Sequence, residues 1–183
     1  MRAAFSKPAP RTRLARPRSI RTRSQHGLDE DGFQCRNCRA FVSMDVLLSG
    51  VENRNHCPYC LWSRHLDWQR PGDRLSACKG SMTPIGLTAK QVRKRYPASP
   101  GELMLVHRCQ ECGKISINRL AADDIPQVLL AVFEASFELD GDSRLHLAAC
   151  GIDLLDLPER LLVDFRLFGA VRSGMAEFPL GPS

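Results

Sequence analysis

The spacing of hydrophobic residues changes along this chain. Apolar and polar residues alternate over Leu103–His107 and Lys114–Asn118, which predicts a β-hairpin. Phe33-Gln34 and Phe41-Val42 predict two further short strands. After residue 118 the apolar residues recur at helical intervals instead. Because the strands precede the helices rather than alternating with them, the pattern predicts an α+β fold.

Two segments of the C-terminal part predict helices. The first begins near Pro126, with Asp123 or Asp124 as its cap. The second has Pro158 in its first turn and ends at Gly169. The apolar positions at helical spacing are Val128, Leu129, Val132, Phe133 and Phe137 in the first helix. In the second, Leu161, Leu162, Phe165 and Phe168 lie on one side, which is expected to cover the strands or to bind a partner.

Six of the eight cysteines lie in three Cys-x-x-Cys pairs: Cys35/Cys38, Cys57/Cys60 and Cys109/Cys112. The first two pairs follow the pattern Cys-x2-Cys-x18-Cys-x2-Cys, which is typical of a structural zinc site. Four thiolates leave no open coordination position, so this site predicts a role in folding rather than in catalysis. The third pair indicates a second zinc ion that needs two more ligands.

Cys78 is the expected third ligand of the second zinc ion, since glycines flank it in a turn-rich segment. The fourth could be His65, His107 or His56. We favour His65, because it lies in the linker between the first site and Cys78. Cys150 follows an apolar helical stretch and is expected to be a buried apolar residue.

Two other uses of the cysteines fit the sequence less well. A secreted disulfide protein would need a signal peptide, and arginines and prolines interrupt the start of this chain. A thioredoxin-like dithiol would need one reactive pair in a βαβ setting, whereas here three pairs lie in turn-rich sequence. The sequence also lacks an apolar run long enough to span a bilayer. We therefore expect reduced, metal-bound thiols in the cytoplasm and no membrane partner.

The net charge of +6 is unevenly distributed. Residues 1–28 carry eight Lys and Arg, no acid and few large apolar residues, which predicts a disordered basic arm. The arm could bind nucleic acid, act as a transit peptide, or be a dispensable extension. Residues 29–138 are expected to form the zinc-binding domain. Residues 139–183, which carry most of the acidic surplus, are expected to form a helical appendage.

One segment carries a recognisable motif. Residues 52–63 contain the string Arg54-Asn55-His56-Cys57-Pro58, and similar matches follow at His65-Leu66-Asp67, Pro71-Gly72-Asp73-Arg74, Cys78-Lys79-Gly80-Ser81-Met82, His107–Gly113 and Asn118–Asp124. Over about residues 30–138 the chain resembles the RNHCP family of small bacterial cysteine-rich proteins. The resemblance implies a zinc-ribbon-like domain and a bacterial cytosolic setting, and it implies no particular activity.

Residues 64–95 combine positive charge with aromatic side chains. Their sum is +6, and Trp68 lies among them while Trp62 and Tyr96 lie beside them. Cations suit phosphates and aromatic rings suit bases, so the segment predicts nucleic-acid binding, RNA or the ribosome ahead of DNA. A solvated charged face is the simpler alternative. The candidate residues are Arg64, Arg70, Arg74, Lys90, Arg93, Lys94 and Arg95, the last four on a short helix expected over 88–96 and capped by Thr88.

Two other functions remain open. A hydrolase could use His56 as a base, with Asp123 and Asp124 holding a divalent ion. The simpler interpretation is that the aspartates cap the helix at Pro126, while Asn53 and Asn55 form turn hydrogen bonds. Alternatively, residues 139–183 could bind a partner protein, which would make the chain an adaptor.

Overall fold

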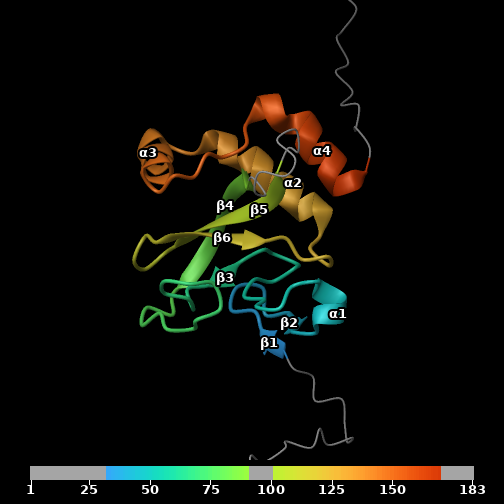
Figure 1. The fold of residues 1–183 in the computed structure, drawn as a ribbon, viewed down its shortest axis with the longest axis vertical. Helices are drawn as coiled ribbons and strands as arrows, with labels where there is room; N and C mark the ends of the chain where they lie inside the picture. Colours follow the sequence, from blue (N-terminus) through green and yellow to red (C-terminus); the bar gives the residue numbers. More distant parts are fainter. Residues whose placement is uncertain (1–31, 91–100, 170–183) are drawn as a thin grey trace, which may run out of the picture.

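A computed structural model describes residues 32–90 and 101–169 of the chain. An antiparallel four-stranded sheet separates the C-terminal helices from a layer of tight turns (Figure 1). The strands are β1 (Gly32–Gln34), β2 (Phe41–Ser43), β3 (Ser63–Arg64), β4 (Ser81–Lys90), β5 (Glu102–Cys109) and β6 (Ile115–Arg119). The helices are α1 (Val46–Ser49), α2 (Pro126–Ala135), α3 (Gly141–Ala149) and α4 (Arg160–Phe168), with 3-10 helices η1 (Ser136–Glu138) and η2 (Leu157–Glu159). The α+β class and the predicted hairpins are confirmed.

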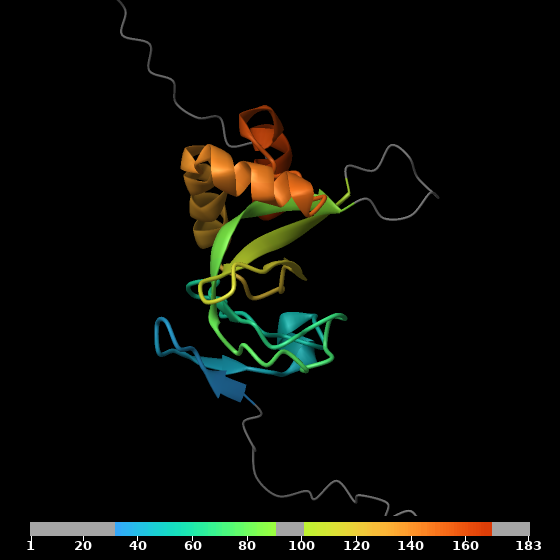
Figure 2. The same ribbon diagram turned by 90° about the vertical axis from the view of Figure 1, so that its left-hand side faces the viewer.

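The main sheet has the order β3-β4-β5-β6, and β1 and β2 form a separate small sheet. Strand β4 runs from the turn layer up to the helices (Figure 2). It contains a bulge, because Pro84 pairs with His107 and Gly86 with Val106. At Gly86 an added Cβ would lie 3.0 Å from Leu154 and 3.1 Å from Ser136, so glycine allows the helical layer to approach the strand closely.

One hydrophobic core lies between the sheet and the helices. Its buried members are Leu61, Leu87, Leu103, Leu105, Leu129, Leu130, Phe133, Leu155 and Val163. Leu155 and Val163 come from the predicted appendage, and the Leu155 N–H donates to the Leu87 carbonyl of β4 at 2.8 Å. The boundary at residue 138 stays a prediction, but residues on both sides of it share this core.

The structure differs from the predicted helix over 88–96 and leaves part of the predicted apolar side of α4 exposed. Residues 88–90 belong to β4, because Ala89 and Lys90 pair with Leu103 and Glu102 of β5; residues 91–96 lie outside the described residues. In α4, Leu161 and Phe165 are 60% and 56% exposed, while Val163 is fully buried. Packing against α2, rather than the periodicity of α4 itself, selects the buried face.

Within the described parts of the chain, every helix is too short or too polar to cross a bilayer.

Candidate metal centres and the adjoining hollow

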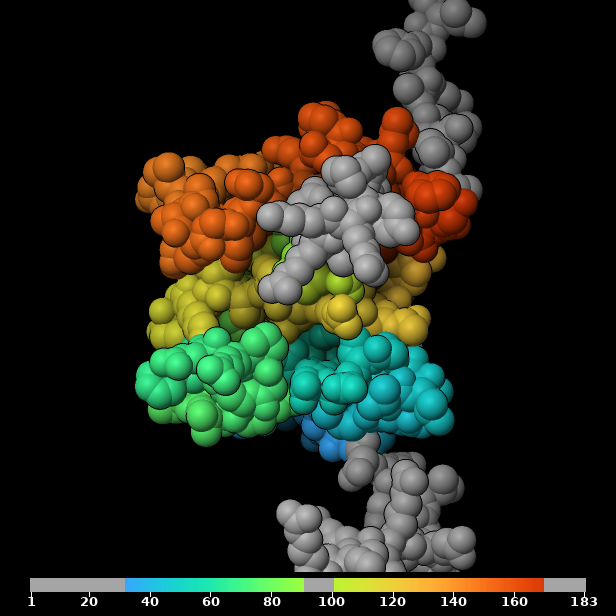
Figure 3. All heavy atoms as spheres, viewed as in Figure 1, coloured from blue at the N-terminus to red at the C-terminus, as the bar shows by residue number. Residues whose placement is uncertain are grey.

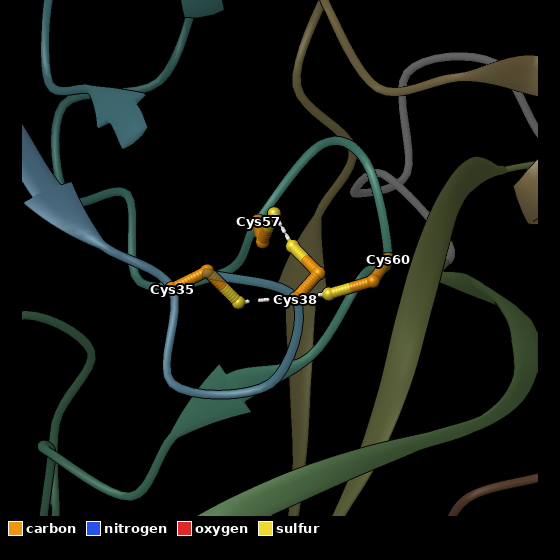
Figure 4. Close-up of side chains that lie close together, drawn as sticks. All are labelled: Cys35, Cys38, Cys57 and Cys60. Atoms are coloured by element: carbon orange, nitrogen blue, oxygen red, sulfur yellow. Dashed lines mark hydrogen bonds between the residues drawn. The ribbon is translucent and has the colours of Figure 1, made fainter. Parts of the chain in front are cut away.

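The first candidate centre comprises Cys35, Cys38, Cys57 and Cys60, whose sulfur atoms all lie within 4.8 Å of one another. Figure 4 shows them pointing toward a common centre. The Cys35–Cys60 and Cys38–Cys57 sulfur separations are 3.6 and 3.5 Å. A disulfide requires about 2.05 Å, whereas tetrahedral zinc with bonds of about 2.3 Å separates its sulfurs by about 3.8 Å. The cluster therefore fits one zinc ion.

The second candidate centre comprises His65, Cys78, Cys109 and Cys112, also within 4.8 Å of one another. His65 Nδ1 lies 3.3 Å from the Cys112 sulfur, and the Cys78 and Cys109 sulfurs are 3.6 Å apart. Burial, followed by the charge of Lys114, lowers the pKa of His65. A lowered pKa favours the neutral imidazole that a metal ligand needs. His65 is thus confirmed as the fourth member of the cluster.

Both centres are positioned to bind zinc, and burial explains why a cation is needed. Burial raises the pKa of the Cys57 thiol well above its ordinary value. A buried thiolate is unfavourable unless a positive charge lies beside it, and a bound divalent ion supplies that charge. None of the eight cysteines, all of which the structure describes, forms a disulfide.

His107, which was one of the three histidine candidates, is a core residue instead. Its Nε2–H donates to the Leu61 carbonyl at 2.7 Å, and its Nδ1 accepts from the Asn118 amide at 2.8 Å. Burial, followed by the charge of His56, lowers the pKa of His107 to about 3. The ring is therefore neutral, and its two hydrogen bonds require a single tautomer.

The three Cys-x-x-Cys turns share one backbone geometry. In each, the residue after the second cysteine has a positive φ: Arg39 (65°), Leu61 (60°) and Gly113 (73°). Its N–H donates to the carbonyl of the first cysteine. The N–H of the first cysteine donates to the carbonyl of the residue that follows the positive-φ residue. The distance is 2.8 Å for Cys35–Ala40 and 2.9 Å for both Cys57–Trp62 and Cys109–Lys114.

His65 and Cys78 form a fourth turn that shares two features of this geometry. The His65 N–H donates to the Gly80 carbonyl at 2.9 Å, and Lys79, directly after Cys78, has a φ of 52°. The two ligands are separated by twelve residues rather than two. The extra residues form a loop, called the insertion loop below (residues 66–77), which is closed where the Ser76 N–H donates to the Leu66 carbonyl at 2.9 Å.

Two aspartates organise the insertion loop. The Asp73 carboxylate accepts from the backbone N–H groups of Trp68, Gln69, Arg70 and Leu75. The N–H of Arg70, followed by those of the other residues, holds the pKa of Asp73 well below its ordinary range. The Asp67 carboxylate accepts from Gly72 and Arg74. These hydrogen bonds to a charged acceptor make the loop an ordered wall rather than a free coil.

Arg54, His56, Asp123 and Asp124 form a network, called the clamp below, in which all but Asp123 are buried. Arg54 Nη1 lies 2.7 Å from the Asp123 carboxylate, and Arg54 Nη2 lies 3.5 Å from that of Asp124. His56 Nε2 lies 2.9 Å from Asp124, which also accepts from the Ala121 N–H at 2.8 Å. The clamp thus attaches the Cys57 turn to the segment between β6 and α2.

The clamp corrects two predictions for the aspartates. Neither caps α2, because the residue at the cap is Ile125 and no side chain accepts a hydrogen bond there. The hydrolytic hypothesis also loses its support. His56 is only 2% exposed, and the Asp124 carboxylate is fully buried among its hydrogen-bond donors. A substrate therefore cannot reach this pair in the described fold.

The clamp and the first centre account for the motif around Arg54. Arg54 and His56 bind the aspartates, Cys57 is a metal-cluster residue, and the Pro58 carbonyl accepts from the Ile125 N–H at 3.2 Å. The RNHCP domain family model matches residues 30–130, more than half of the chain. The chain belongs to the RNHCP domain family. Searches of curated proteins and of solved structures found no match.

Beside the second centre of this RNHCP domain lies a hollow of about 190 Å³. The insertion loop forms one wall and β6 the other, and Figure 3 shows the two segments side by side on one face. The side chains at its surface include three cations, three amides and an aromatic ring: Arg64, Arg70, Lys114, Asn55, Gln69, Asn118 and Trp68. Trp68 is 60% exposed, so its ring is accessible.

The structure separates the predicted nucleic-acid residues. Arg64 and Arg70 line the hollow. Arg74 instead supports the loop, since its Nη2 donates to the Arg54 carbonyl at 3.3 Å. Lys90 is the last residue of the ten-residue strand β4. At a rise of about 3.3 Å per residue it lies about 30 Å from the first residue of that strand, and the hollow adjoins the first residues, since Met82 lines it. Residues 93–95, which supply the remaining three candidates, lie outside the described residues.

Lys114 is a member of the hollow that the sequence argument missed. Its ammonium donates to the backbone carbonyls of Asp67, at 3.2 Å, and of Trp68. It therefore connects the turn after Cys112 with the insertion loop. Its position near a metal ligand was visible in the sequence, but the contact joins residues 46 and 47 positions apart, which no local pattern encodes.

Arg64 gives the hollow an unbalanced positive charge. Burial, followed by the charge of Arg36, lowers the pKa of Arg64. Among the described residues, its Nε is buried and has no hydrogen-bond partner. A partly buried guanidinium without a carboxylate is unfavourable until an anion reaches it. The hollow is therefore suited to a negatively charged group.

The expected burial of Cys150 is wrong, because it is exposed at the C-terminal end of α3. This predicts that a thiol-alkylating reagent modifies one of the eight cysteines rapidly in the zinc-loaded protein, since ligation protects the other seven thiolates. Mass spectrometry with and without a chelator measures this. The variant Cys150→Ser should show no rapid modification, and rapid labelling of several cysteines in that variant would contradict the proposed ligand sets.

Proposed function

We propose that this RNHCP domain is a zinc-stabilised module that binds single-stranded nucleic acid, RNA ahead of DNA, in the hollow beside the second centre. One observation carries the proposal: Arg64, Arg70 and Lys114 surround the hollow together with the exposed ring of Trp68. Cations attract phosphates, and an exposed aromatic ring stacks on unpaired bases. RNA is preferred because its recognition mostly uses unpaired bases splayed onto aromatic side chains.

Asp67, which lines the hollow, and Asp73 of the same insertion loop do not oppose this function. The carboxylates of Asp67 and Asp73 each accept several backbone N–H groups within the insertion loop. Their charge is thereby partly compensated, whereas the Arg64 Nε has no partner in the described structure. The net charge of the side chains around the hollow is positive, and a bound phosphate would neutralise part of that charge.

Salt dependence tests the proposal. The affinity for a single-stranded RNA should fall as salt rises, and Arg64→Ala or Arg70→Ala should make the log–log slope shallower by about 0.7 for each phosphate that the variant no longer neutralises. Trp68→Ala should instead weaken binding by about 1–3 kcal/mol with an unchanged slope, because stacking is uncharged. Fluorescence anisotropy at several salt concentrations measures both quantities.

Lys90→Ala is the matched control, because Lys90 is an exposed cation at the far end of β4. Its salt slope should equal that of the unmodified protein. If Arg64→Ala and Arg70→Ala also leave affinity and slope unchanged, the hollow is not the binding site. Measurements with a single-stranded DNA of the same sequence test the preference for RNA.

The zinc-binding thiols also bear on where the protein works. Seven cysteines in two metal clusters stay reduced only where the cell keeps thiols reduced. We therefore place the domain in the bacterial cytoplasm. Partner binding through residues 139–183 stays a prediction. Leu161 and Phe165 are exposed one turn apart on α4, but nothing in the described residues identifies what would cover them.

A further inference from the structure

Asn55 is the one polar residue of the Arg54–Pro58 motif whose side chain has neither a hydrogen bond nor a place in a metal cluster within the described fold. Its neighbours Arg54 and His56 belong to the clamp, and Cys57 to the first centre. Asn55 is only 9% exposed, yet its amide has no hydrogen-bond partner in residues 32–90 and 101–169. The turn hydrogen bonds expected for Asn53 and Asn55 are absent from these residues, which corrects that prediction.

Asn55 lies at the edge of the hollow. Asn55 lines the hollow of about 190 Å³ together with Arg64, Trp68 and Asn118. The amide atoms of Asn55 are not among the fully enclosed polar atoms that lack a partner, so they keep access from outside the protein. An accessible amide without a partner, at the edge of a hollow lined by cations and an exposed ring, is suited to hydrogen bonds with a ligand.

Asn118 supplies a second polar group whose orientation is set by the core. His107 donates its Nε2–H to Leu61, so its Nδ1 must accept a hydrogen bond from Asn118 Nδ2. This contact assigns the nitrogen of the Asn118 amide to His107 and leaves the oxygen as the free acceptor. The hollow therefore presents two amide oxygens, from Asn55 and Asn118, and the donor nitrogen of Asn55.

We propose that Asn55 reads the edge of an unpaired adenine in the hollow, assisted by the oxygen of Asn118. This inference rests on the proposed nucleic-acid binding. The exocyclic amino group of adenine has two hydrogens, one for each amide oxygen, and its neighbouring ring nitrogen accepts from Asn55 Nδ2. Asparagine pairs with adenine in this two-bond manner. Uracil offers a single N–H and cannot satisfy both oxygens. Cytosine carries an amino group beside a ring nitrogen as adenine does, and adenine is favoured over it by its larger ring system, which stacks more strongly on Trp68.

The proposal is tested by measuring how tightly the unmodified, zinc-loaded full chain binds two RNA oligomers that differ by one amino group. Two short single-stranded RNAs are compared that are identical except at one position. One carries adenosine there. The other carries purine riboside, which is adenosine without its amino group. The adenosine oligomer should bind about tenfold more tightly or better. Equal affinity of the two oligomers, with salt-dependent binding, would overturn base reading by Asn55 and leave the proposed function intact. Binding of neither oligomer would overturn both.

Asn55→Ala should reduce the difference between the two oligomers, because only the Asn118 oxygen is left to accept from the amino group. It should weaken binding of the adenosine oligomer more than that of the purine riboside oligomer, which loses only the hydrogen bond to its ring nitrogen. The matched control is Asn53→Ala, because Asn53 lies in the same segment, is exposed and does not line the hollow. Its preference for adenosine should persist. Zinc content of two ions per chain and an unchanged melting curve establish that Asn55→Ala is folded. A preference for adenosine that is undiminished in this variant would overturn the assignment.

Discussion

Replacing Cys57 with serine should remove zinc from the first centre and unfold the layer of metal-binding turns. Cys57 is fully buried and belongs to the first metal cluster. Structural zinc supplies about 10–16 kcal/mol of apparent binding free energy in small domains, as much as the whole stability of a typical protein, about 5–15 kcal/mol. The Cys57 turn also contributes Leu61 to the main core, so we expect the loss to spread to the sheet.

The measurements are the zinc content per chain and the cooperativity of thermal unfolding. Cys57→Ser should reduce the zinc content from two ions to one or none and abolish the cooperative transition. Cys150→Ser is the matched control, since this exposed thiol lies outside both clusters, and it should keep both properties. A chelator should act like Cys57→Ser. A protein that loses its zinc and still melts cooperatively at the same temperature would show that the apolar core alone maintains the fold.

Asp124→Ala should lower the free energy of unfolding by about 3–5 kcal/mol, the usual effect of removing one member of a buried ion pair. The carboxylate is fully buried beside Arg54, whose side chain is also fully buried, and beside His56. Without Asp124 the guanidinium keeps its hydrogen bond to the His56 carbonyl, but the carboxylate left beside it among the described residues is that of Asp123, which is 37% exposed. Denaturant unfolding at constant zinc concentration measures the change.

An exposed ion pair provides the control for Asp124→Ala. Glu102→Ala removes the partner of Arg119, whose side chain is 67% exposed, and should change stability by about 1 kcal/mol or less. The double replacement of Arg54 by Met and Asp124 by Leu should recover part of the loss, because it leaves neither charge unpaired. A cost of Asp124→Ala as small as that of Glu102→Ala would show that the clamp does not stabilise the fold.

The local patterns predicted those features that depend on residues close together in the chain. A Cys-x-x-Cys turn is complete within a few residues, so spacing alone identified three of the turns and the ligands of the first centre. The α2 helix, and the end of α4 at Gly169 with a φ of 70°, follow from short-range preferences in the same way.

The predictions that were wrong concern residues whose conformation a distant strand or helix decides. Thr88 and its neighbours resemble the start of a helix but pair with β5. The two aspartates resemble a helix cap, yet the charge of Arg54, about 70 positions away, binds them. The fourth turn was hidden because twelve residues separate its ligands.

The sequence by itself therefore determined the metal chemistry, the order of strands and helices and the family. The tertiary structure decided which histidine joins the second cluster, where the buried charges find partners and which polar groups surround the hollow. The physical reason is the range of the interactions. Ligand spacing, turns and helix periodicity act over a few residues, whereas burial and charge pairing depend on which distant segments the folded chain brings into contact.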